Sequence, residues 1–237
     1  MSNSKLVNYT KISPNSSNPR KHKIDKITIH HMAGNLSVEK CGDVFAPKSR
    51  KASSNYGVGS DGRVGLYVDE ANRAWTSSNA ANDNRAVTIE VANDGGAPDW
   101  HVSDKALEKT IELCVDICKR NGIPRLNYTG DKSGNLTMHK WFANTTCPGP
   151  YLESKFPYIA EEVNKRLGGE TVRPEASAYR VKITASLLNV RKGPGTNYRV
   201  ATAVKKDEVY TIVSESNGWG KLKSGAGWIK LSYTKRV

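Results

Sequence analysis

The segment KITIHHMAG, residues 26–34, alternates apolar and polar side chains and ends at a glycine. Successive side chains of a β-strand point to opposite faces of the sheet, so the two isoleucines share one face while Thr28 and His30 share the other. The segment AVTIEVAND, residues 86–94, repeats this pattern with Glu90 at the place of the histidine. If both strands lie in one sheet, His30 and Glu90 face the same cleft. Taken singly, each side chain is typical of the solvent side of a half-buried strand.

Helical patterns lie between and after these strand patterns. We expect helices over three segments, residues 37–46, 103–121 and 150–167. Ser103 is a suitable N-cap for the second helix, and Gly122 is a suitable residue after its end. The mixture favours an α/β or α+β body, and we expect an α/β domain over residues 1–167, with a mixed central β-sheet flanked by helices.

The pattern changes in LGGETVRPEASAY, residues 167–179. Two glycines end the preceding helix, and a proline follows among small and polar residues, which is typical of a linker. We place this linker at residues 168–178. In residues 179–237, short strand patterns alternate with turn residues such as Gly-Pro-Gly and Ser-Asn-Gly. This second part therefore predicts a small all-β barrel or sandwich.

The net charge of +13 is concentrated in that second part. Residues 179–237 contain 12 Lys and Arg against 3 Asp and Glu, a formal charge of +9, which leaves +4 for residues 1–178. A compact basic module suggests an anionic partner. Nucleic acid, an acidic membrane and a polyanionic cell wall all satisfy charge alone.

Membrane insertion and secretion signals are not expected. No apolar run approaches the roughly 18–20 residues that span a bilayer. The N-terminus is polar and has no apolar core of a signal peptide, so we expect synthesis in the cytoplasm without a secretory signal.

Four cysteines are too few for a disulfide scaffold in a chain of 237 residues. Three of them fit small buried core thiols: Cys41, Cys114 and Cys118. The fourth, Cys147, lies in HKWFANTTCPGP, residues 139–150, eight positions after His139. This pair raises the question of a shared site with His30.

Two histidines, one cysteine and one carboxylate have a specific chemical meaning when they meet. Zn²⁺ binds imidazole nitrogen at about 2.0–2.1 Å and thiolate sulfur at about 2.3 Å, and it prefers four tetrahedral ligands. Three protein ligands leave one position for water, which is typical of a catalytic site, and a carboxylate outside the ligand set can move protons. The sequence has no Cys-x-x-Cys pair and no His-Glu-x-x-His, which argues against a closed structural zinc site and against the common helix-borne metalloprotease arrangement.

Four segments together resemble the zinc-dependent N-acetylmuramoyl-L-alanine amidases, the type shared by phage endolysins, bacterial autolysins and peptidoglycan-recognition proteins. ITIHHMAG at 27–34 resembles the first-strand motif of that family. AVTIEVAND at 86–94 resembles the strand with the catalytic glutamate in its endolysin branch, and MHKWFANTTCPGP at 138–150 resembles its closing motif. Residues 53–75 are similar to the segment between, a strand, an Asp-Gly turn and a second strand. The likeness covers residues 26–166 in the family's order.

The resemblance implies one Zn²⁺ per chain, held by His30, His139 and Cys147. It implies that a zinc-activated water cleaves the amide bond between N-acetylmuramic acid and the L-alanine of the stem peptide, with Glu90 passing the proton to the leaving amine. Thr145 stands where relatives have lysine or threonine near the developing oxyanion, and its hydroxyl could donate a hydrogen bond there. The alternative for Thr145 is a turn-forming residue.

One position departs from the family pattern. Some relatives have a catalytic tyrosine seven residues before the Asp-Gly turn, and that position is Ser54 here. No tyrosine role is therefore carried over, and proton transfer rests on Glu90. His31 is expected to pack beside the site or to support a ligand rather than to bind the metal.

The second part resembles the bacterial SH3-like domain of wall hydrolases, through LNVRKGPG at 188–195, SNGWGKL at 216–222 and GWIK at 227–230. The resemblance implies an SH3-like barrel over residues 179–237 that anchors the enzyme to peptidoglycan and to anionic wall polymers. No nucleic-acid partner is expected, and the sequence predicts no oligomeric state.

Two other functions stay open. One is a recognition protein that binds peptidoglycan without cutting it, and the other is a basic nucleic-acid-binding protein, which would leave the four site residues unexplained. Between a phage or prophage endolysin and a host autolysin, the polar N-terminus favours the endolysin, which reaches the wall after holin-type release.

Overall fold

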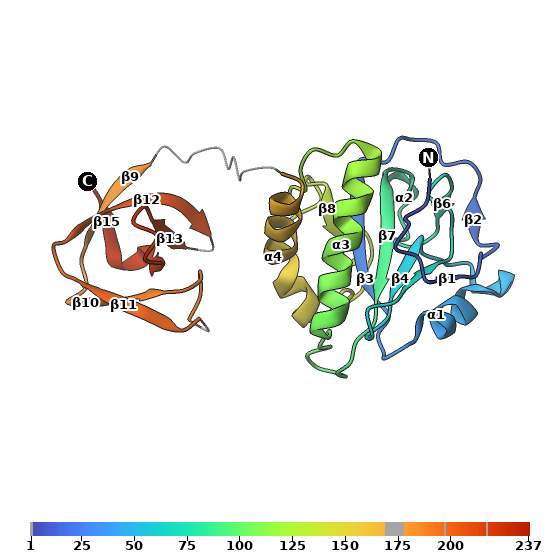
Figure 1. Ribbon diagram of the computed structural model, residues 1–237, viewed down its shortest axis with the longest axis horizontal. Coiled ribbons are helices and arrows are strands. Elements are labelled where there is room, and N and C mark those ends of the chain that lie inside the picture. Colours follow the sequence, from blue (N-terminus) through green and yellow to red (C-terminus); the bar gives the residue numbers. More distant parts are fainter. Residues whose placement is uncertain (1, 169–177, 197, 217) are drawn as a thin grey trace. The chain divides into compact units, whose positions relative to one another are not determined.

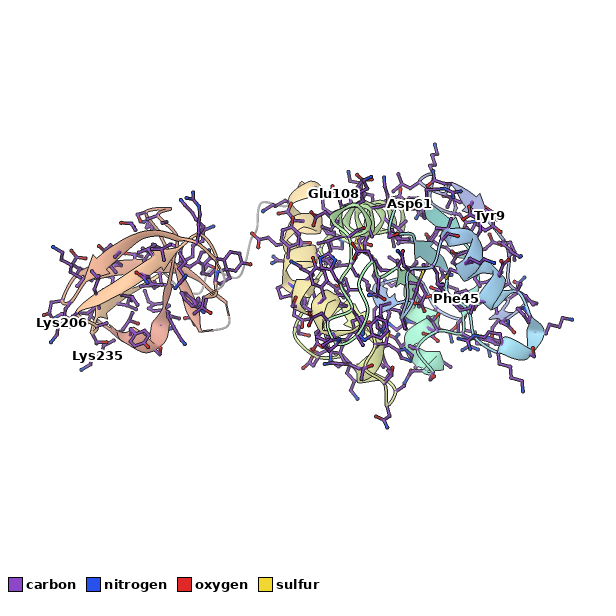
Figure 2. All side chains as sticks on the ribbon, turned by 90° about the horizontal axis from the view of Figure 1, so that it is seen from below. Tyr9, Phe45, Asp61, Glu108, Lys206 and Lys235 are labelled. Carbon is purple, nitrogen blue, oxygen red and sulfur yellow. The ribbon has the colours of Figure 1, made fainter. Side chains whose placement is uncertain are left out.

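The computed structural model forms two compact units, residues 1–171 and 172–237 (Figure 1), whose side chains are drawn in Figure 2. It describes residues 2–168, 178–196, 198–216 and 218–237. Most of the predicted linker, residues 169–177, lies outside the described residues. Each unit has a hydrophobic core of its own.

A six-stranded mixed sheet forms the centre of the first unit. Its strands follow the order β1, β5, β4, β7, β3, β8 across the sheet. In that order their bounds are Tyr9–Thr10, Val64–Leu66, Tyr56–Val58, Ala86–Val91, Lys26–His31 and Leu136–Met138. The neighbours β4, β7, β3 and β8 are parallel, whereas β4 and β5 form an antiparallel pair. The two strands expected from the sequence, β3 and β7, are therefore adjacent within the sheet.

Helices accompany this sheet on both faces (Figure 1). The helices α1, α2, α3 and α4 span Val38–Phe45, Ala80–Arg85, Asp104–Asn121 and Pro150–Arg166. Two short 3₁₀ segments, η1 and η2, span Lys48–Arg50 and His139–Trp141, and a separate two-stranded sheet pairs β2, Ser16–Ser17, with β6, Arg73–Ala74. The three helices expected from the sequence are confirmed as α1, α3 and α4. α3 and α4 pack together over one face of the sheet, and α1 and α2 lie over the other.

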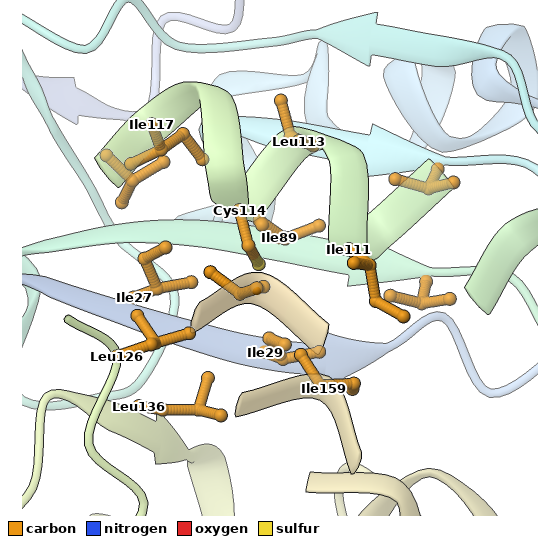
Figure 3. Close-up of a cluster of buried hydrophobic side chains, with 14 of the residues drawn as sticks. Ile27, Ile29, Ile89, Ile111, Leu113, Cys114, Ile117, Leu126, Leu136 and Ile159 are labelled. Atoms are coloured by element: carbon orange, nitrogen blue, oxygen red, sulfur yellow. The ribbon is translucent and has the colours of Figure 1, made fainter. Parts of the chain in front are cut away.

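The main core lies between the sheet and the pair α3–α4 (Figure 3). Ile27 and Ile29 of β3 and Ile89 of β7 are fully buried there. Ile111 of α3 and Ile159 of α4 pack against them from the helix side. Burying a side chain of this size contributes roughly 1.5–3 kcal/mol, so this face fixes the orientation of both strands. Because side chains alternate along a strand, Thr28 and His30 of β3 must then point to the opposite face.

The ends of α3 follow the local chemistry of the sequence. The hydroxyl oxygen of Ser103 accepts a hydrogen bond from the backbone N–H of Ala106 at 3.1 Å, and Gly122 closes the helix in the left-handed conformation, with φ of 64°. The N-cap and the terminating glycine expected from the sequence are confirmed. The three cysteines expected in the core are all buried: Cys41, Cys114 and Cys118.

The second unit is an antiparallel seven-stranded sheet with a small core of its own. Its strand order is β11, β10, β14, β13, β12, β9, β15. In that order the bounds are Val200–Lys205, Leu187–Arg191, Trp228–Lys230, Trp219–Leu222, Val209–Ser216, Tyr179–Ile183 and Thr234–Arg236, and a 3₁₀ segment, η3, spans Leu231–Tyr233. Among the described residues, eight buried apolar side chains form the core: Val181, Ile183, Leu188, Val190, Val204, Ile212, Leu222 and Ile229. The expected all-β second part is confirmed, as is the mixed α/β class of the first.

Among the described residues, none of the helices combines the length and the apolar character needed to cross a membrane.

Candidate metal centre

Strand pairing brings the candidate residues to one edge of the sheet. His30 of β3 and Glu90 of β7 are direct partners in the parallel register, so their side chains lie side by side on the face opposite the main core. β8 is the other neighbour of β3, and His139 follows its last residue. Because the carboxyl ends of parallel strands meet at one edge, three chain segments deliver their polar residues to the same place.

His30, His139 and Cys147 form a compact cluster at this edge. Their candidate ligand atoms all lie within 4.8 Å of one another. The Nδ1 atom of His30 is 3.7 Å from Sγ of Cys147, and the two imidazole centroids are 4.7 Å apart. His30 is fully buried, Cys147 is buried, and His139 is half-buried.

The donor set of this cluster fits zinc. Two ligands at about 2.05 and 2.3 Å from a tetrahedral ion are separated by about 3.6 Å, which matches the nitrogen–sulfur distance of 3.7 Å. The Nε2 atoms of His30 and His139 are buried, and no described residue forms a hydrogen bond with either of them. Because Nδ1 of His30 and Sγ of Cys147 lie at a separation that fits zinc, and the ligand atoms of all three residues lie within 4.8 Å of one another, the cluster is better suited to hold a cation than to pack as ordinary core.

The protonation states of the three side chains also suit a metal. Burial, followed by the proximity of His139 and His31, lowers the pKa of His30 well below its ordinary value. Burial likewise lowers the pKa of His139. Both imidazoles are therefore neutral at neutral pH, as a ligand must be. Burial and then the charge of Glu90 raise the pKa of the Cys147 thiol far above its ordinary value, so its thiolate needs a nearby cation.

A tight turn holds Cys147 in place. Its Sγ accepts a hydrogen bond from the backbone N–H of His31 at 3.4 Å, and its carbonyl accepts one from the backbone N–H of Lys140 at 3.1 Å. Gly149 has φ of 81°, and a Cβ there would lie 3.0 Å from Cβ of Trp100 and 3.2 Å from Nδ1 of His31. The His31 ring in turn meets the Trp100 ring edge-on at 5.3 Å. The turn is packed so closely that only glycine fits at position 149.

Glu90 stands beside the cluster without belonging to it. It is half-buried, and among the described residues no side chain or backbone group forms a hydrogen bond with its carboxylate. Burial raises the pKa of Glu90 to about 8, and the nearby positive charge of Arg50 acts weakly in the other direction. A cation held by the cluster would act in the same direction as Arg50 and lower the pKa of Glu90, because it favours the charged carboxylate. The residue is thus placed to accept and release a proton near neutral pH.

Thr145 takes part in the turn before Cys147. Its hydroxyl oxygen accepts a hydrogen bond from the backbone N–H of Cys147 at 3.2 Å. This contact supports the turn-forming alternative, and it leaves the hydroxyl hydrogen available as a donor. The residue is half-buried.

Three other aromatic residues have structural contacts. Tyr56 faces the main core, and its hydroxyl donates to the buried carboxylate of Glu70 at 2.7 Å. The indole N–H of Trp75 donates to the hydroxyl of Ser17 at 2.9 Å. Trp141 stacks on Tyr128, with centroids 6.0 Å apart. None of these contacts joins the metal cluster.

One residue near Glu90 was missed by the sequence analysis. The side chain of Tyr67 lies across two strand glycines. A Cβ at Gly57 would lie 2.7 Å from its ring, and a Cβ at Gly65 would lie 2.5 Å from its hydroxyl oxygen. Gly57 is the register partner of Glu90, so the buried tyrosine lines the floor beside the carboxylate. The signal in the sequence was the pair of glycines inside short strands, which marks close approach of a neighbouring group.

Comparisons with known proteins agree with this geometry. Residues 20–150 match the family model described as N-acetylmuramoyl-L-alanine amidase, and residues 186–235 match the model described as bacterial SH3 domain. No curated protein matches the chain.

Solved structures resemble the first unit. The structure of PlyL matches at 14% identity with a TM-score of 0.53, covering 66% of this chain and 96% of that one. The PlyG catalytic domain matches at 14% identity and a TM-score of 0.52, covering 69% and 96%. A mutant endolysin from Bacillus subtilis matches at 18% identity and a TM-score of 0.50, covering 66% and 99%. At this identity the likeness shows the fold alone.

Proposed function

The chain belongs to the N-acetylmuramoyl-L-alanine amidase family, and from this premise we propose that it hydrolyses the amide bond between the lactyl group of N-acetylmuramic acid and the L-alanine of the peptidoglycan stem peptide. The observation that carries the proposal is the cluster of His30, His139 and Cys147, whose ligand atoms lie within 4.8 Å of one another beside the carboxylate of Glu90.

His30, His139 and Cys147 would hold one zinc ion per chain. When bound, such an ion supplies a Lewis acid for the amide carbonyl and lowers the pKa of water. The three side chains contribute neutral imidazoles and a thiol that loses its proton on binding. The backbone N–H of His31 then stabilises the sulfur, since it already donates to Sγ at 3.4 Å.

Glu90 would act as the general base and then as the general acid. Its carboxylate takes a proton from the attacking water and passes it to the leaving amine of L-alanine. The raised pKa, about 8, supports both steps, because a group poised near the working pH both accepts and releases the proton. Arg50 favours the ionised form needed for the first step.

Thr145 would assist as a hydrogen-bond donor. Its oxygen is fixed by the backbone N–H of Cys147, so the hydroxyl hydrogen is the part left to interact with the oxyanion that develops on the carbonyl. Removing a donor of this kind costs roughly 10²- to 10³-fold in rate where the donor is fully aligned.

The second unit would hold the enzyme on its substrate. Residues 179–237 carry a formal charge of +9 and match a bacterial SH3 domain. Teichoic-acid-like and other anionic wall polymers are partners that such a charge attracts.

The test is the identification of the cleaved bond. Purified protein is incubated with peptidoglycan, and the products are analysed by mass spectrometry and by labelling of new amino groups. We expect new L-alanine amino ends and intact glycan strands, with no such ends in the Glu90→Gln variant. Binding of peptidoglycan without new amino ends would identify a recognition protein instead.

A further inference from the structure

Three neighbouring strands of the second unit place a tryptophan between basic residues. Trp228 of β14 pairs with Arg191 of β10 on one side and with Lys221 of β13 on the other. Directly paired residues of antiparallel strands point to the same face of the sheet. Lys230 follows Trp228 by two residues and shares that face as well. These four residues are called the Trp228 face.

The side chains of this face are accessible and partly fixed in position. Lys221 and Lys230 are exposed, whereas Arg191 and Trp228 are half-buried. The ammonium group of Lys221 lies 6.0 Å from the centre of the Trp228 ring, which is the outer range of a cation–π contact. Nη1 of Arg191 donates to the carbonyls of Thr196 at 3.0 Å and Tyr198 at 2.7 Å. These bonds hold the guanidinium in place, and its N–H groups on Nε and Nη2 can donate to a ligand.

The three acidic residues of the segment 179–237 lie elsewhere. Asp207 forms an ion pair with Lys182 at 3.3 Å, and Glu208 accepts hydrogen bonds within its own turn. Glu215 pairs with Gly220, the residue that precedes Lys221 in β13. Because adjacent strand residues point to opposite faces, Glu215 points away from the Trp228 face. It accepts a hydrogen bond from the hydroxyl of Tyr179 there. Among the described residues, no carboxylate forms an ion pair with Lys221 or Lys230.

We propose that the Trp228 face binds the phosphodiester groups of an anionic wall polymer of the polyol-phosphate type. Lysine and arginine donate charge-assisted hydrogen bonds to phosphate oxygens. Arg191 and Lys221 flank Trp228 on the two adjacent strands, so their backbone positions are about 10 Å apart, and Lys230 lies about 7 Å from Trp228 along β14. Trp228 in the middle supplies an apolar surface for the CH groups of the polyol or sugar between two phosphates. This inference deepens the wall-binding role proposed for the second unit and rests on it.

The test compares two double variants of the full-length protein that remove the same charge. Lys221→Ala/Lys230→Ala removes the two exposed cations of the face. Lys206→Ala/Lys235→Ala is the matched control, because both lysines are exposed and extend from the second unit at the β11–β12 turn and on β15 (Figure 2). All four positions are at the surface, so both variants should fold, and circular dichroism checks this.

Binding is measured by co-sedimentation with cell walls that contain teichoic acid, before and after acid extraction of the phosphodiester polymer. We expect the wild type and the control variant to bind native walls more tightly than extracted walls. The Lys221→Ala/Lys230→Ala variant should lose roughly tenfold in affinity for native walls, and change little on extracted ones. Soluble teichoic acid should compete with this binding, while double-stranded DNA at equal phosphate concentration should compete far less.

Three results would overturn the inference. An equal loss in the control variant would show that overall charge acts without a defined face. An equal loss on native and extracted walls would assign the face to peptidoglycan itself, and equal competition by DNA would make it a site for any polyanion. Hydrolysis of soluble muropeptides, measured on the same samples, separates a failure of this inference from a failure of the proposed amidase activity. Wild-type protein that binds neither wall preparation would end the wall-binding proposal as a whole.

Discussion

The Nδ1 atom of His30 lies 3.7 Å from Sγ of Cys147, although the two residues stand 117 positions apart in the chain. β3 carries the histidine, and the turn after η2 carries the cysteine. The parallel pairing of β3 with β8 brings the two segments to one edge of the sheet. The candidate metal centre is therefore a product of strand pairing, and changes in the cysteine turn should affect metal binding before they affect the fold.

The Gly149→Ala variant tests that turn. Alanine at φ of 81° is strained, and its Cβ would press on Trp100 and His31, so the turn must shift and move the thiol. We expect zinc affinity to fall roughly tenfold, which is typical when groups that orient a ligand are disturbed. Gly122→Ala is the matched control, because it has φ of 64° in open space. Both variants should lose about 1 kcal/mol of stability, and equal zinc affinity in the two would speak against the account.

Zinc affinity should rise with pH. Burial keeps the Cys147 thiol protonated through the neutral range in the metal-free protein, so binding must release that proton. The imidazoles of His30 and His139 have lowered pKa values and are already neutral, so they contribute no further protons above pH 7. We expect at least a tenfold gain in affinity per pH unit between pH 7 and 8.5, because Glu90, with a pKa of about 8, also loses its proton when the ion binds. Competition with a chromophoric chelator measures this gain. A flat profile would exclude the thiol as a ligand.

Glu90→Gln should separate catalysis from metal binding. The amide keeps the size of the side chain but cannot take a proton, so turnover should fall roughly 10²- to 10⁴-fold. Zinc content should stay unchanged, because Glu90 lies outside the ligand cluster. Amide hydrolysis and metal analysis on the same preparation test both statements. Undiminished turnover would remove Glu90 from the mechanism.

In the zinc-free protein, the difference in stability between Glu90→Gln and the wild type should depend on pH. The pKa of Glu90 is raised from 4.5 to about 8, so the folded state holds its proton more tightly than the unfolded state. The stabilisation from this proton is complete below about pH 4.5 and is lost as the pH rises toward 8. The stability of Glu90→Gln relative to wild type should therefore increase from pH 5 to pH 8, by on the order of 2 kcal/mol after solvent screening. Urea unfolding at several pH values measures it, and a constant difference would mean that burial does not raise this pKa.

Removal of residues 179–237 should separate hydrolysis from wall attachment. The first unit has its own core, so it should fold alone and cleave small muropeptides at a nearly unchanged rate. Co-sedimentation with intact walls should weaken, and for the full chain it should weaken with added salt, because salt screens the exposed charges. Unchanged sedimentation of the truncated protein would contradict the role of the second unit.

Periodicity in the sequence predicted the central part of the fold. The alternation around Ile27 and Ile29 placed His30 on the opposite face, and the same alternation placed Glu90 beside it. The parallel register of β3 and β7 agrees with this placement. Ser103 and Gly122 predicted the ends of α3 because capping is local chemistry. Such features depend on neighbours within a few residues, which a sequence displays directly.

Other features depend on contacts between distant segments. Strands of two or three residues, such as β1 and β4, are too short to show a period, and they exist because a neighbouring strand pairs with them. The packing of Tyr67 over Gly57, and of His31 against Gly149, follows from the tertiary arrangement and not from spacing. The sequence therefore indicated which residues carry the chemistry, but not the side chains that surround them.

The zinc content of two matched cysteine variants tests the central claim most directly. Cys147 and Cys41 are both buried thiols, and only the first belongs to the cluster with His30 and His139. Elemental analysis of purified protein should find one zinc per chain in the wild type and in Cys41→Ser, and almost none in Cys147→Ser. One zinc per chain retained in Cys147→Ser, or none in the wild type after loading with zinc, would contradict the account.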